Sequence, residues 1–135
     1  PFGQARTVVA GSDITIVAMS RMVVIAEQAA EQLKEKGISA EVIDLRTLSP
    51  LDEGAVLESL AKTGRLVVVD ESNPYCSMAS EIAGLAVERG FDTLDAPVKR
   101  VTAPHTPVPA TPCLEIEYVP NAAKVIAAVE ETLAY

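Results

Sequence analysis

Two pairs of polar residues stand where the chain leaves an apolar run, and they are the first candidates for chemistry. Asp70 and Glu71 follow one such run, and Ser20 and Arg21 follow another. In open α/β sheets, ligands bind in the crevice beyond the carboxyl ends of the strands, where the strand order reverses. The pattern therefore predicts one of two roles for these side chains: lining a crevice for a small molecule or anion, or capping and ion pairing.

Two single residues could support catalysis. His105 is the sole histidine and therefore the only candidate general base, but no Ser or Cys nucleophile stands near it in the sequence. The simpler interpretation is a loop histidine that contacts backbone or a partner. Cys76 precedes a predicted helix, and a thiol at a helix N-terminus can have a lowered pKa. The simpler interpretation is that Cys76 is a small, partly buried hydrophobic residue.

The motifs of most α/β enzymes are absent. The chain has no Gly-rich phosphate loop, no GxGxxG, no pair of close cysteines and no GxSxG turn. A single histidine also rules out a His-rich metal site. We therefore expect no catalysis by this chain alone.

A buried strand over residues 65–71 is the element around which the rest is arranged. Its apolar residues, three of them valine, are consecutive and show no alternation, so both faces of the strand should be covered. We predict that this is the central strand of a mostly parallel sheet. Further strands are predicted at 14–19, 41–45 and 98–102.

Four helices are predicted between and after these strands. Apolar residues recur at helical spacing in the segments 20–36, 52–62, 77–89 and 121–133. Ser20, Asp52 and Asn121 are predicted to cap three of them, and Gly37 is predicted to end the first.

Composition limits the remaining possibilities. A chain of 135 residues predicts one domain, which we place at 14–135, with 1–13 as a linker or edge arm. The formal net charge of −8 argues against nucleic acid and anionic membrane as partners. Two distant cysteines allow a single disulfide, but reduced thiols in a cytoplasmic protein are the favoured interpretation. The start at Pro1 suggests a fragment of a longer polypeptide.

A proline-rich loop is the candidate interface. Four prolines in residues 104–112 exclude a helix or a sheet interior and predict an extended surface loop. The loop and the segment after it offer mixed apolar and polar contacts to another subunit, from His105, Val108, Leu114, Ile116 and Tyr118. The alternative is that Leu114 and Ile116 pack the loop onto the domain itself.

Four blocks of sequence carry a family resemblance: 42–52 (VIDLRTLSPLD), 62–71 (KTGRLVVVDE), 96–101 (APVKRV) and 114–120 (LEIEYVP). In this order and spacing they resemble the C-terminal domain of the beta subunit of thiamine-diphosphate-dependent 2-oxo-acid dehydrogenases, the transketolase C-terminal domain class. Residues 70–76 and 102–109 look most like those of acetoin dehydrogenase beta subunits. The chain departs from the family pattern at 18–21 and at 110–111, which leaves contacts at those loops in question.

The resemblance implies a three-layer α/β/α fold with a five-stranded, mostly parallel sheet and one antiparallel edge strand, for which residues 7–9 are the candidate. It implies that thiamine diphosphate and Mg²⁺ are held by another domain and by the alpha subunit, so no catalytic or cofactor-binding residue maps onto this chain. The implied partners are the alpha subunit and a second beta subunit in a heterotetramer, and the dihydrolipoamide acyltransferase core. The alternative function is an autonomous α/β domain that binds a small molecule or anion in the crevice near Ser20 and Asp70.

Overall fold

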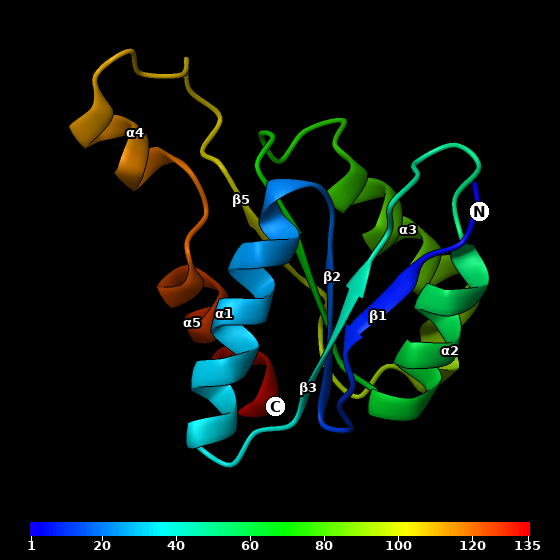
Figure 1. Cartoon of the computed structure of the whole chain (residues 1–135). Helices are drawn as coiled ribbons and strands as arrows, with labels where there is room; N and C mark the ends of the chain where they lie inside the picture. Colours follow the sequence, from blue (N-terminus) through cyan, green and yellow to red (C-terminus); the bar gives the residue numbers. More distant parts are fainter.

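The computed structural model describes all residues 1–135 and is a three-layer α/β/α sandwich built on a five-stranded sheet (Figure 1). The strands are β1 (Arg6–Val9), β2 (Ile14–Ala18), β3 (Ala40–Asp44), β4 (Leu66–Asp70) and β5 (Lys99–Thr102). The helices are α1 (Arg21–Glu35), α2 (Glu53–Thr63), α3 (Met78–Gly90), α4 (Pro112–Tyr118) and α5 (Ala122–Leu133), with a 3₁₀ turn at Phe91–Thr93. The expected three-layer fold is confirmed.

The strand order is β1-β3-β2-β4-β5, with only the β1–β3 pair antiparallel. The expected antiparallel edge strand is therefore confirmed at Arg6–Val9. The prediction that residues 65–71 form the central strand was wrong, because β2 occupies the middle and β4 lies between β2 and β5. Burial on both faces identifies an interior strand, but it does not distinguish one interior position from another.

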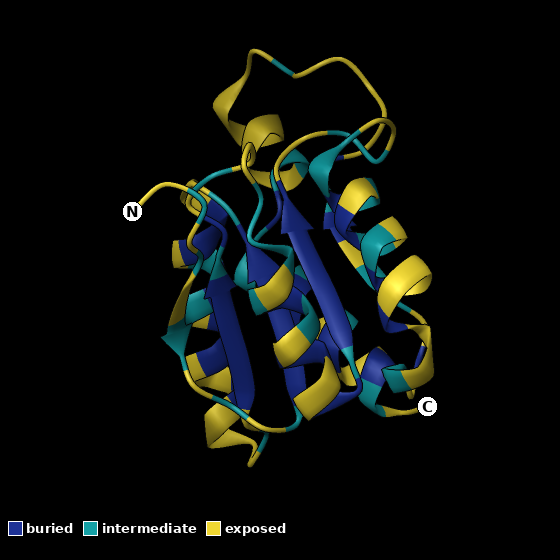
Figure 2. Cartoon of the chain, turned by 90° about the vertical axis from the view of Figure 1, so that its right-hand side faces the viewer, coloured by how far each residue is buried: buried dark blue, intermediate teal, exposed yellow.

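The core consists of two apolar layers, one on each face of the sheet. Successive side chains of a strand point to opposite faces. Val67 and Val69 therefore join the layer under α1 and α5, whereas Val68 joins the layer under α2 and α3. Every residue of β2 and β4 is buried, as the dark blue strands in Figure 2 show.

Most of the predicted helix ends are present. The carboxylate of Asp52 accepts from Ala55 N at 3.1 Å, the amide oxygen of Asn121 accepts from Lys124 N at 3.0 Å, and Gly37 has φ +80°. The prediction that Ser20 caps α1 was wrong, because its side chain makes no capping bond. Ser20 has φ 52° and ψ −132°, whereas a capping residue normally has an extended backbone.

Helix α4 was not predicted. Its first residue, Pro112, supplies the fixed φ that suits a helix start. The helix has seven residues, none of them buried, so it presents no apolar stripe that sequence periodicity could detect.

A buried polar network lies at the amino-terminal edge of the sheet. Glu41 of β3 is 4% exposed. Its carboxylate accepts from the Ser59 hydroxyl at 2.6 Å, forms an ion pair with Lys62 and accepts from Gly11 N at 3.4 Å. The hydroxyl of Thr15 lies 2.6 Å from that of Ser59, which connects β2, β3 and α2 through side chains.

These contacts change the acidity of Glu41. Burial raises the pKa of the carboxyl group, but the bonds from Lys62, Ser59 and Gly11 and the charge of Lys62 outweigh it and lower the pKa below its ordinary value of 4.5. A lowered folded-state pKa means that ionised Glu41 stabilises the fold at neutral pH. This stabilisation is lost as the pH falls from about 4.5 through the folded-state pKa.

The first testable consequence is the pH dependence of Glu41→Gln. We expect this variant to be less stable than wild type by about 1–3 kcal/mol at neutral pH, because buried donors lose a charged acceptor. The difference should shrink as the pH falls from about 4.5 through the lower folded-state pKa, because Glu41 takes up its proton first in the unfolded chain and at lower pH in the folded one. Urea unfolding of both proteins, from neutral pH to below pH 4.5, measures the difference in their free energies of unfolding. Glu58→Gln, on the exposed face of α2, is the control, and a difference that does not vary with pH would contradict the role of the Glu41 charge.

Val68→Asp tests the interior position of β4. Val68 is 0% exposed, so its replacement would bury a charge without a partner. We expect a loss of several kcal/mol, comparable with the stability of a whole domain, about 5–15 kcal/mol. Val24→Asp, at a position 54% exposed, should cost little. A soluble Val68→Asp variant with an unchanged melting temperature would refute the assignment.

Candidate functional site

The predicted site residues lie at the carboxyl-terminal edge of the sheet. Strands β2, β4 and β5 are parallel, so their carboxyl ends open on the same edge. The segment that follows β5, including α4, rises above this edge and stands away from the body of the domain (Figure 1). Two regions can be distinguished there: the predicted crevice at the ends of β2 and β4, and the proline-rich arm, which we define as residues 104–119.

The carboxylate of Asp70 accepts hydrogen bonds from two backbone N–H groups. Its side chain is buried, one carboxylate oxygen accepts from Ser72 N at 2.9 Å and the other accepts from Ala79 N at 3.3 Å. Asp70 therefore ties the turn after β4 to the first turn of α3. Of the two roles that the sequence left open for this residue, the geometry favours capping.

The other three crevice residues are exposed. Ala18 pairs with Val69, so the structure brings the ends of β2 and β4 together as the sequence suggested. Ser20, Arg21 and Glu71, which follow those strands, all lie at the surface, and no salt bridge joins any of them to another residue. Arg21 instead lines a hollow between the start of α1 and helix α4.

Arg100 holds the loops at this edge, a role that sequence reasoning missed. Its guanidinium donates to the carbonyl of Pro74 at 2.8 Å and to the Ser80 hydroxyl at 2.6 Å. It thus joins β5, the turn after β4 and the first part of α3. The only signal in the sequence was a charged residue inside a predicted strand, which by itself does not reveal its partners.

His105 contacts an aromatic ring. Its imidazole lies edge-on to Tyr75, with ring centroids 4.6 Å apart and an interplanar angle of 75°. Both residues are exposed, as is the free thiol of Cys76, which has φ +50°. The contact joins the turn after β4 to the proline-rich arm, and the expectation that His105 contacts backbone or a partner stays a prediction.

The proline-rich arm carries large apolar side chains in water. Val108 and Ile116 are each 70% exposed and Leu114 is 59% exposed. Leu114 and Ile116 therefore do not pack the loop onto the domain, which was the alternative expectation. The Tyr118 hydroxyl donates to the carbonyl of Thr106 at 3.0 Å and so closes the arm on itself.

A short helix of this kind gains little stability on its own. Isolated helices of fewer than about 12 residues are marginal in water, and α4 has seven residues and buries none of them. Lys124 of α5 donates to the carbonyl of Glu117 and thereby fixes the end of α4 to the domain. The arm is thus held at its base and exposes its apolar side chains outward.

The side chains that could hold a metal ion do not come together in this structure. No group of three or more His, Cys, Asp or Glu side chains is placed to hold a metal ion. None of the helices is long and apolar enough to cross a membrane.

Comparison with known proteins places the chain in a family. Residues 3–125 match the family described as transketolase, C-terminal domain. The chain is 52% identical over 133 residues to the acetoin:2,6-dichlorophenolindophenol oxidoreductase subunit beta of Bacillus subtilis (strain 168), covering 98% of this chain and 39% of the relative. It is 45% identical over 135 residues to the pyruvate dehydrogenase E1 component subunit beta of Leifsonia xyli subsp. xyli (strain CTCB07), covering 100% of this chain and 40% of the relative.

A solved structure shows the same fold. A split gene transketolase, described as an inactive beta4 tetramer, superposes with a TM-score of 0.87 at 32% identity, covering 98% of this chain and 43% of that one. The present chain spans about two fifths of the length of the curated relatives it matches.

Tyr118→Phe tests whether the Tyr118 hydroxyl orders the arm. We expect a nearly unchanged melting temperature, because the bond is exposed and local. Amide hydrogen exchange across residues 105–118 should accelerate by about threefold to tenfold, since a net hydrogen bond of 0.5–1.5 kcal/mol is removed. The matched control is Tyr75→Phe, which keeps the ring beside His105. Equal exchange rates in both variants would show that the bond does not order the arm.

Proposed function

Because the chain belongs to the transketolase C-terminal domain family, we propose that it is the C-terminal domain of the beta subunit of a thiamine-diphosphate-dependent dehydrogenase that acts on acetoin or a 2-oxo acid. Its own role is assembly and docking, and the catalytic activity belongs to the complete enzyme. The names of the relatives support this proposal, since both are beta subunits of oxidoreductases or dehydrogenases.

Cofactor binding is assigned elsewhere in the complete enzyme. In the class that the sequence resembles, thiamine diphosphate and Mg²⁺ are held by a preceding domain and by the alpha subunit. The present residues offer no metal-holding cluster and no Gly-rich phosphate loop. We propose that the chemical steps take place in those other parts of the complete enzyme.

The observation that carries the docking role is the exposure of Val108, Leu114 and Ile116 on an arm that buries nothing. Contiguous exposed apolar patches mark interaction surfaces, and three large apolar side chains in water on one short segment are candidates for such a patch. Covering them by a partner would remove apolar surface from water, at about 25 cal/mol per Å². A partner would therefore bury the apolar surface that the fold of this chain leaves in water.

The arm is also suited to binding at low entropic cost. Its prolines restrict the backbone before a partner arrives, so less freedom is lost on docking. The ring contact of His105 with Tyr75 and the bond from Tyr118 restrict it further. An arm ordered in this way presents the same surface before and after assembly.

The proposed partners are other subunits of a multienzyme complex in the cytoplasm. They are the alpha subunit and a second beta subunit, which together form a heterotetramer, and the dihydrolipoamide acyltransferase core. The tetrameric split gene transketolase supports contacts between beta-type chains, since its description names a beta4 assembly. The net charge of −8 disfavours nucleic acid and anionic membranes.

The decisive experiment uses the complete beta subunit with Val108→Asp and Ile116→Asp together. Both positions are 70% exposed, so we expect the melting temperature of the domain to stay nearly unchanged. Association with the alpha subunit should weaken by about tenfold or more, because two charges would be placed in a desolvated contact. Analytical ultracentrifugation of the mixed subunits measures the change.

The matched control is Val24→Asp with Gln28→Glu on the exposed side of α1, which adds the same charge away from the arm. It should leave assembly unchanged. Tight assembly of the Val108 and Ile116 double variant, or equal weakening in the control, would exclude the arm as the interface.

A further inference from the structure

Residues 1–5, which precede β1, are held by the loop that connects β3 to α2. That loop belongs to the block 42–52, one of the four that carry the family resemblance, and it contributes nothing to the predicted crevice or to the proline-rich arm. Two of its side chains, those of Thr47 and Asp52, accept hydrogen bonds from backbone N–H groups 44 and 47 residues away in sequence. The start of the chain is therefore fixed by tertiary contacts.

Asp52 uses both of its carboxylate oxygens. Oδ1 accepts from Ala55 N at 3.1 Å and caps α2, and Oδ2 accepts from Ala5 N at 2.8 Å. Ala5 directly precedes the first residue of β1 and packs against the apolar layer under α2 and α3. One carboxylate thus connects the start of a helix to the start of the edge strand.

Thr47 holds the chain two residues earlier. Its hydroxyl accepts from Gly3 N at 3.0 Å and donates to the carbonyl of Pro50 at 3.0 Å. Gly3 has φ +75°, a conformation that favours glycine, and a Cβ at this position would lie 2.9 Å from Cγ of Pro50. The absence of a side chain at Gly3 therefore allows the close approach. We call the four residues Gly3, Ala5, Thr47 and Asp52 the entry clasp.

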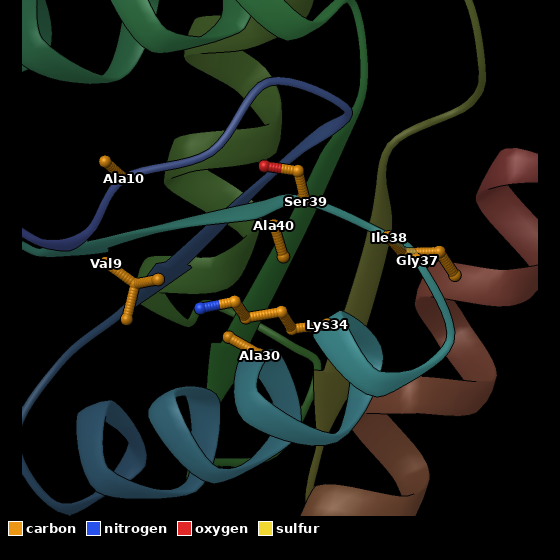
Figure 3. A pocket seen from close by; sticks show the side chains of 8 residues that line it. All are labelled: Val9, Ala10, Ala30, Lys34, Gly37, Ile38, Ser39 and Ala40. Atoms are coloured by element: carbon orange, nitrogen blue, oxygen red, sulfur yellow. The ribbon is translucent and has the colours of Figure 1, made fainter.

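The other end of β1 is built differently. Val9 and Ala10 border a hollow of about 300 Å³ between β1, α1 and β3 (Figure 3). Lys34 is the only charged residue of its lining, and Figure 3 shows the Ser39 side chain on the opposite side of β3 from Ala40 and Lys34. Of the two ends of β1, the start is thus the one where two polar side chains converge on the backbone.

We propose that the entry clasp makes residues 1–5 a rigid junction to the part of the complete beta subunit that precedes this domain. In the proposed function, on which this rests, the chain is the C-terminal domain of a longer subunit. Chains usually pass between domains through flexible linkers, so relative motion of two domains is the default. A junction held at Gly3 and Ala5 instead fixes the direction in which the chain enters β1.

A rigid junction would favour assembly of a defined complex. The preceding domain and the proline-rich arm would keep one relative orientation, so less freedom would be lost when several subunits meet. Phe2 is 91% exposed and adjoins Gly3, so the clasp also holds an aromatic ring in a set position for contact with the preceding domain.

Limited proteolysis of the complete beta subunit with chymotrypsin tests the junction, because cleavage after Phe2 requires local opening of the backbone. Asp52→Asn keeps an oxygen to cap α2 and turns an NH₂ group toward the Ala5 N–H, so this variant loses the clasp bond and keeps the cap. We expect cleavage between Phe2 and Gly3 to accelerate by about threefold to tenfold, as expected for one lost hydrogen bond. The melting temperature should stay nearly unchanged.

Thr47→Val provides a second, independent variant. It removes the acceptor of the Gly3 N–H with little change in volume and should accelerate cleavage to a similar extent. The chain of 135 residues gives a readout without the preceding domain. In this chain, amide exchange of Ala5 in Asp52→Asn and of Gly3 in Thr47→Val should accelerate by about threefold to tenfold.

The matched control is Asp13→Asn. The Asp13 carboxylate accepts from Ser39 N at 2.7 Å in the turn before β2, so the variant removes the same charge without touching the clasp. It should leave cleavage and exchange at residues 1–5 unchanged. Unchanged cleavage in Asp52→Asn and Thr47→Val, or equal acceleration in the control, would overturn the rigid junction. Faster exchange without faster cleavage would overturn it too, and none of these results bears on docking by the proline-rich arm.

Discussion

The interior strands β2 and β4 impose the main physical constraint on this domain. Every residue of both strands is buried, so their backbone groups have no access to water and must bond to neighbouring strands, while both faces must be covered by apolar surface. Helices α1 and α5 cover one face and α2 and α3 cover the other. With the sheet enclosed in this way, the strands meet other molecules only at the edges of the sheet and through the segments beyond them.

The two edges stabilise the fold by different means. At the amino-terminal edge, Glu41 and Ser59 place a charge and a hydroxyl inside the protein and bond them to each other. At the carboxyl-terminal edge, Asp70 and Arg100 bond to backbone atoms of the turn and helix that follow β4. A buried network costs desolvation but fixes one arrangement when every member is satisfied. The capping bonds, in turn, set the positions of the loops from which the proline-rich arm rises.

The arm and the body of the domain illustrate two ways of using apolar residues. In the body, apolar side chains are covered by the chain itself. In the arm, Val108, Leu114 and Ile116 remain in water although the surrounding backbone is ordered by prolines and by the Tyr118 hydroxyl. An ordered segment with uncovered apolar groups is the physical basis of the proposal that the domain serves assembly. The relatives, all longer than this chain, provide the setting in which such a surface would be covered.

The sequence by itself determined the layers, most of the helices and the edge strand. Runs of valine and isoleucine, helical spacing and capping residues such as Asp52 and Asn121 act locally, and the four blocks that resemble the family added the antiparallel strand. Only the tertiary structure decided that β2 is central, because two interior strands have the same local pattern. It also decided the partners of Arg100, since the guanidinium bonds to Pro74 and Ser80, which are distant in sequence. Helix α4 was not predicted for a different reason. Helical spacing of apolar residues identifies helices that bury one face, and α4 buries no residue.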